Sequence, residues 1–268
     1  MIFRLVICVI VLSSTTSWSM DFTVGKKLKT GQVLFNNAIL MEGEIREGDA
    51  SRFLQFIKEN RAVIIDELLS VVPSSNGGSV SEAIKIAKTI EDGMFAVWLP
   101  PNIKDWPDRS KQVRCASSCF LFVVAGASRV IHKETVGLHR PYFDAKVYGA
   151  ISTATAISAH ERLLLEMRAW LSTRGVPASL IEKMMNHSSR EIYWMSYDDI
   201  QALGAIRPSA EELMIAKCDY DKALFGRWSD AALAKHPSTA EIEKKLTAQS
   251  GCTNALVKAA RSAFLSTY

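Results

Sequence analysis

The sequence predicts an α/β fold with a mainly parallel sheet, followed by a small helical appendage. Short apolar runs alternate with amphipathic helical segments between about residues 33 and 139, which is the pattern of βαβ units. From about Pro208 the chain becomes charged, rich in alanine and helical in pattern. The chain has 268 residues, of which 48% are hydrophobic and 22% charged. That length and composition allow one sizeable core.

Residues 33–100 supply the first part of this alternation. Three runs have the apolar residues of strands, and two segments between them repeat apolar residues at helical spacing. In chain order the predicted elements are the strand 33–45, the helix 46–60, the strand 62–72, the helix 81–93 and the strand 94–100. We expect Asp49 to cap the first helix and Gly93 to end the second. The turn SSNGGSV, residues 74–80, connects the second strand to its helix.

Residues 117–206 continue the alternation. The segment 117–127 is apolar on nearly every side and therefore predicts a buried helix. Gly175 ends a long helical pattern, and Ser196 stands where it can cap the last helix. In chain order the predicted elements are the helix 117–127, the strands 128–131 and 135–139, the helices 148–175 and 177–187, the strand 192–196 and the helix 197–206.

The N-terminal residues have the layout of a secretory signal peptide. Arg4 precedes a short apolar run, and the small residues Ser17 and Ser19 fit a cleavage site. We therefore predict that residues 1–19 are removed and that the protein is periplasmic or secreted. An uncleaved membrane anchor is the alternative, although the run is far shorter than the ~20 residues that a spanning helix needs.

Four cysteines remain after such a cleavage, and their even number is typical of disulfides in an exported chain. Among the three possible connectivities, sequence order favours Cys115–Cys119 and Cys218–Cys252. Disulfide-bonded Cβ atoms lie closer than those of residues four apart on a helix, so Cys115 must precede the helix. Free thiols and zinc ligands are the alternatives, and zinc is disfavoured because no histidine stands close by in suitable spacing.

Three short segments carry polar residues suited to acyl transfer. Gly77 and Gly78 stand at a strand-to-helix turn, where a positive φ lets backbone N–H groups point into a cleft and hold an oxyanion. Ser117 and Ser118 stand at the start of a helix, where free amides and the helix dipole favour an anion. His139 ends the next strand. Taken one at a time, a tight turn, helix caps and a core histidine are the structural alternatives.

In this order, the segments resemble the Clp protease proteolytic subunit and the wider crotonase-like superfamily. SSNGGSV is similar to the family's S-P-G-G-S/V turn, ASSC to its A-A-S-M helix start, and GLHRP to its M-I-H-Q-P strand end. The resemblance covers about residues 36–206, and the cysteines and signal peptide are most similar to exported bacterial members. It implies a crotonase/Clp-protease-like ββα superhelix for residues 20–207, with residues 208–268 as the helical appendage.

The resemblance also implies roles for individual residues. Position by position, Ser118 matches the family's nucleophile and His139 its base. The backbone amides of Gly77, Gly78 and Cys119 match the oxyanion hole. No metal or cofactor is implied.

The aspartate of the family has no match in this sequence. Ile192 stands at the best-matching position, and the adjacent Glu191 points to the opposite face of the strand. The other candidates to orient His139 are Asn186, Ser188 and Asp144. The sequence therefore predicts a Ser-His dyad with a substitute orienting group, or an enzyme that is weak or inactive.

These features favour an exported, ATP-independent serine peptidase that acts on peptides or unfolded proteins. The missing aspartate favours the alternative of an inactive binding or scaffold protein, and acyl-CoA chemistry is disfavoured by export. The net charge of +4 is spread along the chain, so no nucleic-acid partner is predicted. No membrane span is expected after signal removal. The long helix near residues 151–174 could mediate homo-oligomer formation or pack on its own sheet.

Overall fold

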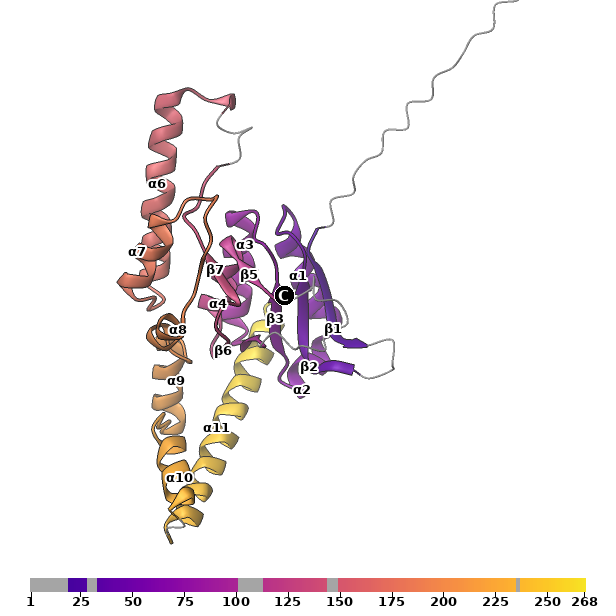
Figure 1. Ribbon diagram of the computed structural model, residues 1–268. Coiled ribbons are helices and arrows are strands. Elements are labelled where there is room, and N and C mark those ends of the chain that lie inside the picture. The colour runs from indigo at the N-terminus through magenta and orange to yellow at the C-terminus, as the bar shows by residue number, and fades with distance from the viewer. Residues whose placement is uncertain (1–18, 28–32, 101–112, 144–148, 235–236) are drawn as a thin grey trace, which may run out of the picture.

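The computed structural model describes residues 19–27, 33–100, 113–143, 149–234 and 237–268. Nearly all of the predicted signal peptide, and Asp144, lie outside these residues. The described chain is a mixed α/β structure with two sheets, in which most strand pairs are parallel (Figure 1). The predicted class, α/β with a mainly parallel sheet, is confirmed. The superhelix of the family stays a prediction.

The larger sheet has the strand order β1-β2-β3-β4-β6. Its strands are β1 (Asp21–Lys27), β2 (Val33–Glu42), β3 (Ser70–Ser74), β4 (Val97–Leu99) and β6 (Arg129–Ile131). Only β1 runs antiparallel to its neighbour in this sheet. The sequence did not predict β1, because DFTVGKK has few apolar residues and forms a strand by pairing along β2.

The smaller sheet stands next to β3 and has the order β5-β7-β8. Its strands are β5 (Cys115–Ala116), β7 (Val136–Leu138) and β8 (Tyr193–Trp194), and only β8 is antiparallel. Ser75 connects the two sheets: its amide donates to the Arg114 carbonyl oxygen at 2.8 Å, and its own carbonyl accepts from the amide of Ala116 at 2.9 Å. The carboxyl ends of β3, β5 and β7 therefore lie at one edge.

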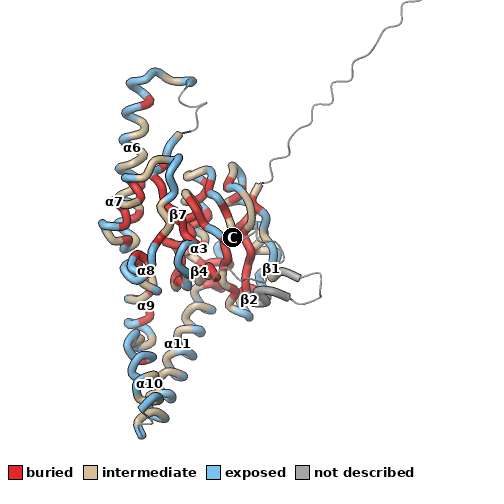
Figure 2. The backbone as a smooth tube through the Cα atoms, viewed as in Figure 1, coloured by how far each residue is buried: buried red, intermediate tan, exposed pale blue. Residues whose placement is uncertain are grey.

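Helices cover the sheets and bury the core. They are α1 (Asp49–Glu59), α2 (Arg61–Asp66), α3 (Val80–Asp92), and α4 (Phe120–Ala125), which follows a 3-10 turn over Ser117–Cys119. Every residue of α4 is buried, as its all-round apolar sequence predicts. Figure 2 shows the buried segments concentrated in the sheets and the helices packed on them.

Residues 62–72 do not form the single strand that the sequence predicted. The first part of this run belongs to α2, and β3 begins only at Ser70. Ile64 points into the core from α2, while Val63 and Ile65 are half-buried. Periodicity alone does not separate a buried helix from a buried strand in a short apolar run.

Asp49 does not cap α1 as predicted. Gly48 is the N-cap residue and Asp49 is the first helical residue. The carboxylate of Asp49 is completely buried and accepts hydrogen bonds from the amide of Arg46 at 2.7 Å and that of Met20 at 3.3 Å. Asp49 therefore fastens the chain before β1 to the start of α1.

The remaining helices are α6 (Thr153–Ser172), α7 (Ala178–Asn186), α8 (Tyr197–Leu203), α9 (Pro208–Cys218), α10 (Leu224–Leu233) and α11 (Thr239–Ser266). Ser196 caps α8, as predicted, in a capping box with Asp199. The upper part of α6 and the pair α10 and α11 extend away from the sheets in opposite directions (Figure 1). In the described residues, no helix combines the length and the apolar character needed to cross a bilayer.

The last helix returns to the sheets and joins their core (Figure 1). Arg261 is buried and donates hydrogen bonds to the carbonyl oxygens of four residues. These residues are Ile64, Leu69, Gly93 and Met94. Burial lowers the pKa of the Arg261 guanidinium to about 10, and Phe264 and Leu265 pack into the main core. The end of the predicted appendage thus contributes to the α/β core, and the boundary at residue 207 stays a prediction.

Candidate active site

The structure brings the three predicted segments to the carboxyl ends of neighbouring strands. The chain after β3 leads to Gly77 and Gly78, and the chain after β5 leads to Ser117 and Ser118. His139 directly follows β7, which pairs in parallel with β5. Adjacent strands lie about 5 Å apart, so the glycine turn, the serines and the histidine share one edge.

The glycine turn has no room for side chains. Gly77 and Gly78 have φ values of 97° and 141°. A Cβ atom on Gly77 would lie 2.5 Å from the Cβ atom of Ser117, and one on Gly78 would lie 2.1 Å from the carbonyl oxygen of Ile45. Glycine is therefore required at both positions.

The two glycine amides differ in availability. The amide of Gly77 donates to Ser75 Oγ at 3.1 Å. The amide of Gly78 donates to no residue among those that the structure describes. Of the two oxyanion donors predicted in this turn, Gly78 has the free N–H group.

Ser118 is buried and its hydroxyl is engaged. Only 4% of the residue is exposed, and its Oγ atom donates a hydrogen bond to the carbonyl oxygen of Gly78 at 3.1 Å. This bond ties the serine helix to the glycine turn. To attack a substrate, the Ser118 hydroxyl would first have to leave this carbonyl.

Ser117 is in a different state. It is half-buried, and its hydroxyl makes no hydrogen bond to any described residue. Its φ of 59° lies in the left-handed region, which costs a residue with a side chain roughly 1–2 kcal/mol. Its Cβ and Oγ atoms are the nearest side-chain atoms to Gly77. Strained residues of this kind cluster at functional sites when their surroundings hold them in place.

Both disulfides favoured by the sequence are present. Cys115 and Cys119, with Cα atoms 5.2 Å apart, enclose the two serines, and both cysteines are completely buried. Cys115 lies in β5, before the helical turn begins, as the geometry of a disulfide requires. Cys218 and Cys252 join α9 to α11 with Cα atoms 5.6 Å apart. No group of three residues that could hold a metal ion occurs in the described part of the chain.

His139 is buried and is held by the backbone of the next residue. It is 6% exposed, and its Nδ1 atom lies 2.9 Å from the carbonyl oxygen of Arg140. Because a carbonyl oxygen can only accept, Nδ1 donates the proton of this hydrogen bond, and Nε2 is the ring nitrogen that this contact does not use. Neither Ser117 nor Ser118 is hydrogen-bonded to the imidazole in this structure.

Ile192 directly precedes β8, and His139 directly follows β7, the strand that pairs with β8. The antiparallel register pairs Gly137 with Trp194 and Leu138 with Tyr193, and one further step puts Ile192 opposite His139. The Ile192 side chain lies over Gly137, and 44% of the residue is exposed. The Ile192 side chain is apolar, and the group that lies near the imidazole is the Tyr142 ring, with 5.8 Å between the two ring centroids.

Three of the other predicted orienting groups are not hydrogen-bonded to His139. Within the described ranges, Asn186, Ser188 and Glu191 make no hydrogen bond to its ring, and Asp144 lies outside those ranges. The carbonyl oxygen of Arg140 accepts the hydrogen bond from His139 Nδ1 that a carboxylate was expected to accept. The sequence could not identify it, because every residue has a carbonyl group.

Asp199 holds β8, the strand that begins just after Ile192. Its carboxylate accepts hydrogen bonds from Tyr193 at 2.5 Å, from Lys183 at 2.6 Å, and from the amide and hydroxyl of Ser196, both at 2.9 Å. Burial alone would raise the pKa of Asp199, but these hydrogen bonds outweigh it and lower the pKa to about 2. The carboxylate therefore fixes α7, α8 and β8 to one another.

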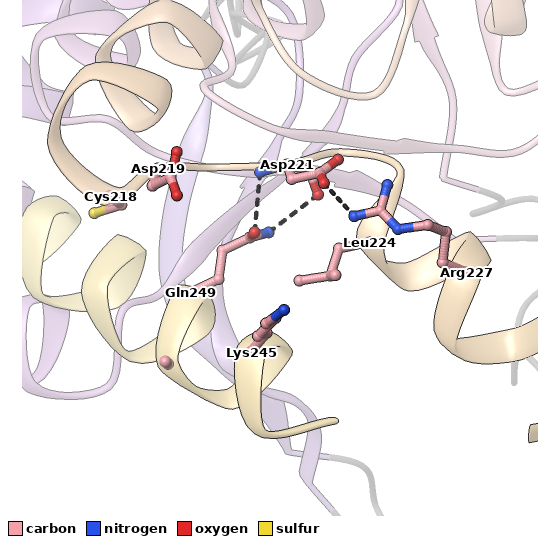
Figure 3. Close-up of a pocket in the computed structure, with 8 residues that line it drawn as sticks. Cys218, Asp219, Asp221, Leu224, Arg227, Lys245 and Gln249 are labelled. Atoms are coloured by element: carbon pink, nitrogen blue, oxygen red, sulfur yellow. Dashed lines mark hydrogen bonds and ion pairs between the residues drawn. The ribbon is translucent and has the colours of Figure 1, made fainter. Parts of the chain in front are cut away.

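A pocket of about 450 Å³ lies away from the serines, between the start of α10 and the middle of α11 (Figure 3). Asp221 forms an ion pair with Arg227, and its amide donates to the Gln249 side chain at 2.9 Å. Asp219, Lys245 and the Cys218 end of the second disulfide also line the pocket. Among the described residues of this lining, only Asp221 and Arg227 form an ion pair with each other, whereas Lys245 pairs with Glu241 one turn earlier on α11.

Comparison with known proteins adds no family assignment. No protein-family model matches the chain, and no curated protein matches it. Among solved structures, a point mutant of ClpP1 from Listeria monocytogenes is similar at a TM-score of 0.34 and 16% sequence identity. That match covers 63% of this chain and 88% of the ClpP1 chain. At this TM-score the likeness carries no argument about fold or activity.

Proposed function

We propose that the chain is a Clp-protease-like serine hydrolase that cleaves peptides or unfolded proteins by acyl transfer, without ATP. One observation carries this proposal. The Gly77–Gly78 turn, the Ser117–Ser118 pair and His139 come from distant parts of the sequence and meet at the carboxyl ends of β3, β5 and β7. A nucleophile, a base and free backbone amides at one edge are the parts that acyl transfer requires.

The resemblance assigns the nucleophile to Ser118, whereas the geometry supports Ser117. The Ser117 hydroxyl is free of hydrogen bonds to the described residues, and its left-handed backbone sets it against the glycine turn. The Ser118 hydroxyl is bonded to the Gly78 carbonyl. We therefore assign the attack to Ser117 and give Ser118 the role of anchoring the helix, with Ser118 as the alternative nucleophile.

In the proposed mechanism, Ser117 Oγ attacks the substrate carbonyl while Nε2 of His139 takes its proton. The tetrahedral oxyanion accepts hydrogen bonds from the amides of Gly78 and Ser118. His139 then gives the proton to the leaving amine, and a water molecule releases the acyl group by the same steps. Closer approach of the serine and the imidazole accompanies substrate binding, since catalytic hydrogen bonds are often long in free enzymes.

The setting of the proposed enzyme is an oxidising compartment. Two disulfides support export, because disulfides persist outside the reducing cytosol. ATP-driven unfolding of substrates is unsuited to such a compartment, so the substrates would be peptides or chains that are already unfolded. Assembly into homo-oligomers through α6 stays a prediction.

An inactive binding or scaffold protein is the second candidate. The observation that favours it is Ile192 opposite His139, where the family resemblance calls for an aspartate. In that case the Arg140 carbonyl would orient a histidine that performs no catalysis.

Hydrolysis by the purified chain beginning at Met20 tests the proposal. Cleavage of an unfolded protein such as reduced casein is measured without ATP, with and without a fluorophosphonate inhibitor. The hydrolase predicts cleavage that the inhibitor blocks and that His139→Ala removes. Absence of both cleavage and labelling by the inhibitor would favour the scaffold.

A further inference from the structure

The disulfide between Cys115 and Cys119 closes a small ring that contains both serines. Ala116 and the two serines are the only residues between the cysteines, and Ser117 has its φ of 59° inside this ring. A serine does not keep a left-handed backbone unless its surroundings hold it there. Two contacts do so here: the disulfide, and the hydrogen bond from Ser118 to the Gly78 carbonyl.

We propose that the Cys115–Cys119 disulfide positions Ser117 against the glycine turn, so that the site reaches full activity only after oxidation. This inference rests on the proposed function. Without the covalent bond, Ser117 can relax to a right-handed backbone and extend α4 toward the N-terminus. The Ser117 hydroxyl would then move away from Gly77. In the present structure the two residues are so close that a Cβ atom on Gly77 would lie 2.9 Å from Ser117 Oγ.

The oxidation has a simple balance. Each cysteine thiol gives up one proton and one electron, and the S–S bond forms between the two sulfur atoms. A small disulfide oxidant, such as oxidised glutathione, takes up the two electrons and two protons as its own S–S bond breaks into two thiols.

Burial makes this oxidation a single maturation step. Cys115 and Cys119 are both 0% exposed in the folded chain. Reduction requires a thiolate to approach a sulfur atom directly, which the surrounding core prevents. The disulfide therefore forms during folding and then persists, and a chain that folds in a reducing compartment keeps an unassembled serine site.

The second disulfide provides a matched control. One variant carries Cys115→Ala with Cys119→Ala, and the other carries Cys218→Ala with Cys252→Ala. For peptide hydrolysis, we expect the first variant to lower kcat about tenfold or more at an unchanged KM, because the reacting group is misplaced while binding is kept. The second variant should keep kcat, although it opens the longer loop and should have the lower Tm.

Hydrogen exchange gives a readout that does not need activity. Mass spectrometry should find the amides of residues 115–125 exchanging faster in the first variant than in the second, because the ring has lost its closure. Equal kcat in the two variants, or equal exchange over this segment, would overturn the proposal. If the oxidised parent chain has no activity but the exchange differs as expected, the hydrolase fails while the positioning role of the disulfide stands.

Discussion

The hydroxyl of Ser118 donates a hydrogen bond to the carbonyl oxygen of Gly78, with 3.1 Å between the two oxygen atoms. This bond joins the start of the serine helix to a turn 40 residues earlier in the chain. It occupies one hydroxyl of the serine pair, while the neighbouring hydroxyl of Ser117 has no hydrogen-bond partner among the described residues. The two adjacent serines therefore differ in their hydrogen bonding, and we propose different roles for them.

Replacement of each serine separates these roles. Ser117→Ala should lower kcat/KM by about 10³-fold or more, as loss of a nucleophile does in other hydrolases. Ser118→Ala removes a hydrogen bond worth about 1 kcal/mol of stability and should lower kcat/KM far less than Ser117→Ala, because the disulfide still holds Ser117 in place. Turnover of a fluorogenic peptide measures both variants. If Ser118→Ala instead lost more activity than Ser117→Ala, Ser118 would be the nucleophile.

An aspartate at position 192 should increase activity. Ile192→Asp places a carboxylate directly before β8, where it can accept from Nδ1 of His139 and stabilise the imidazolium that forms during attack. Position 192 is 44% exposed, so the new charge stays partly hydrated and costs little stability. The control Ile192→Val keeps an apolar side chain there. We expect kcat to rise only in the aspartate variant, and a fall in kcat with intact folding would show that the Arg140 carbonyl is the better partner.

A methyl group at Gly77 should abolish activity. Gly77→Ala would place a Cβ atom 2.5 Å from that of Ser117, at a φ that alanine rarely adopts. Ser117 or the turn must then move. Gly251→Ala is the control, because Gly251 lies within α11 with open space around it, and alanine there should stabilise the chain by up to about 1 kcal/mol. Fluorophosphonate labelling and Tm are measured for both glycine variants. Unchanged labelling of Gly77→Ala would contradict the proposed site.

The carboxylate of Asp199 should stabilise the fold in a pH-dependent way. Its folded pKa of about 2 lies below its ordinary value of 3.8. The unfolded chain therefore binds the proton first as the pH falls, so the stabilisation is complete above about pH 5 and is lost as the pH falls through about 2. Its size at neutral pH is about 2 kcal/mol.

Asp199→Asn lacks this titrating group. The difference in unfolding free energy between the parent chain and this variant should therefore shrink from pH 6 to pH 2. Urea unfolding at a series of pH values measures it. A difference that is constant over this range would show that the hydrogen bonds to Asp199 do not depend on its charge.

Much of the site follows from the sequence because its parts are local patterns. A Gly-Gly pair between a strand and a helix, serines at a helix start and a histidine at a strand end are each visible in short segments. The alternation of strands and helices then brings them to one edge of the sheets. Sequence order favours the pairing of Cys115 with Cys119, on the condition that Cys115 precedes the helix, and the structure meets that condition.

Other features depend on backbone geometry that residue types do not encode. The positive φ of Ser117 distinguishes it from Ser118 although the two residues are identical. The acceptor for His139 is the Arg140 carbonyl, which has no sequence signal. Likewise, the run that became α2 and β3 was predicted as one strand, because a short apolar segment fits either element.

Mapping the site of a fluorophosphonate adduct identifies the nucleophile directly. The oxidised chain from Met20 is labelled, digested and sequenced by tandem mass spectrometry. We expect one adduct per chain, on Ser117, and its loss in His139→Ala. An adduct on Ser118 would contradict the assignment of the nucleophile, and no adduct on either serine would contradict the hydrolase itself.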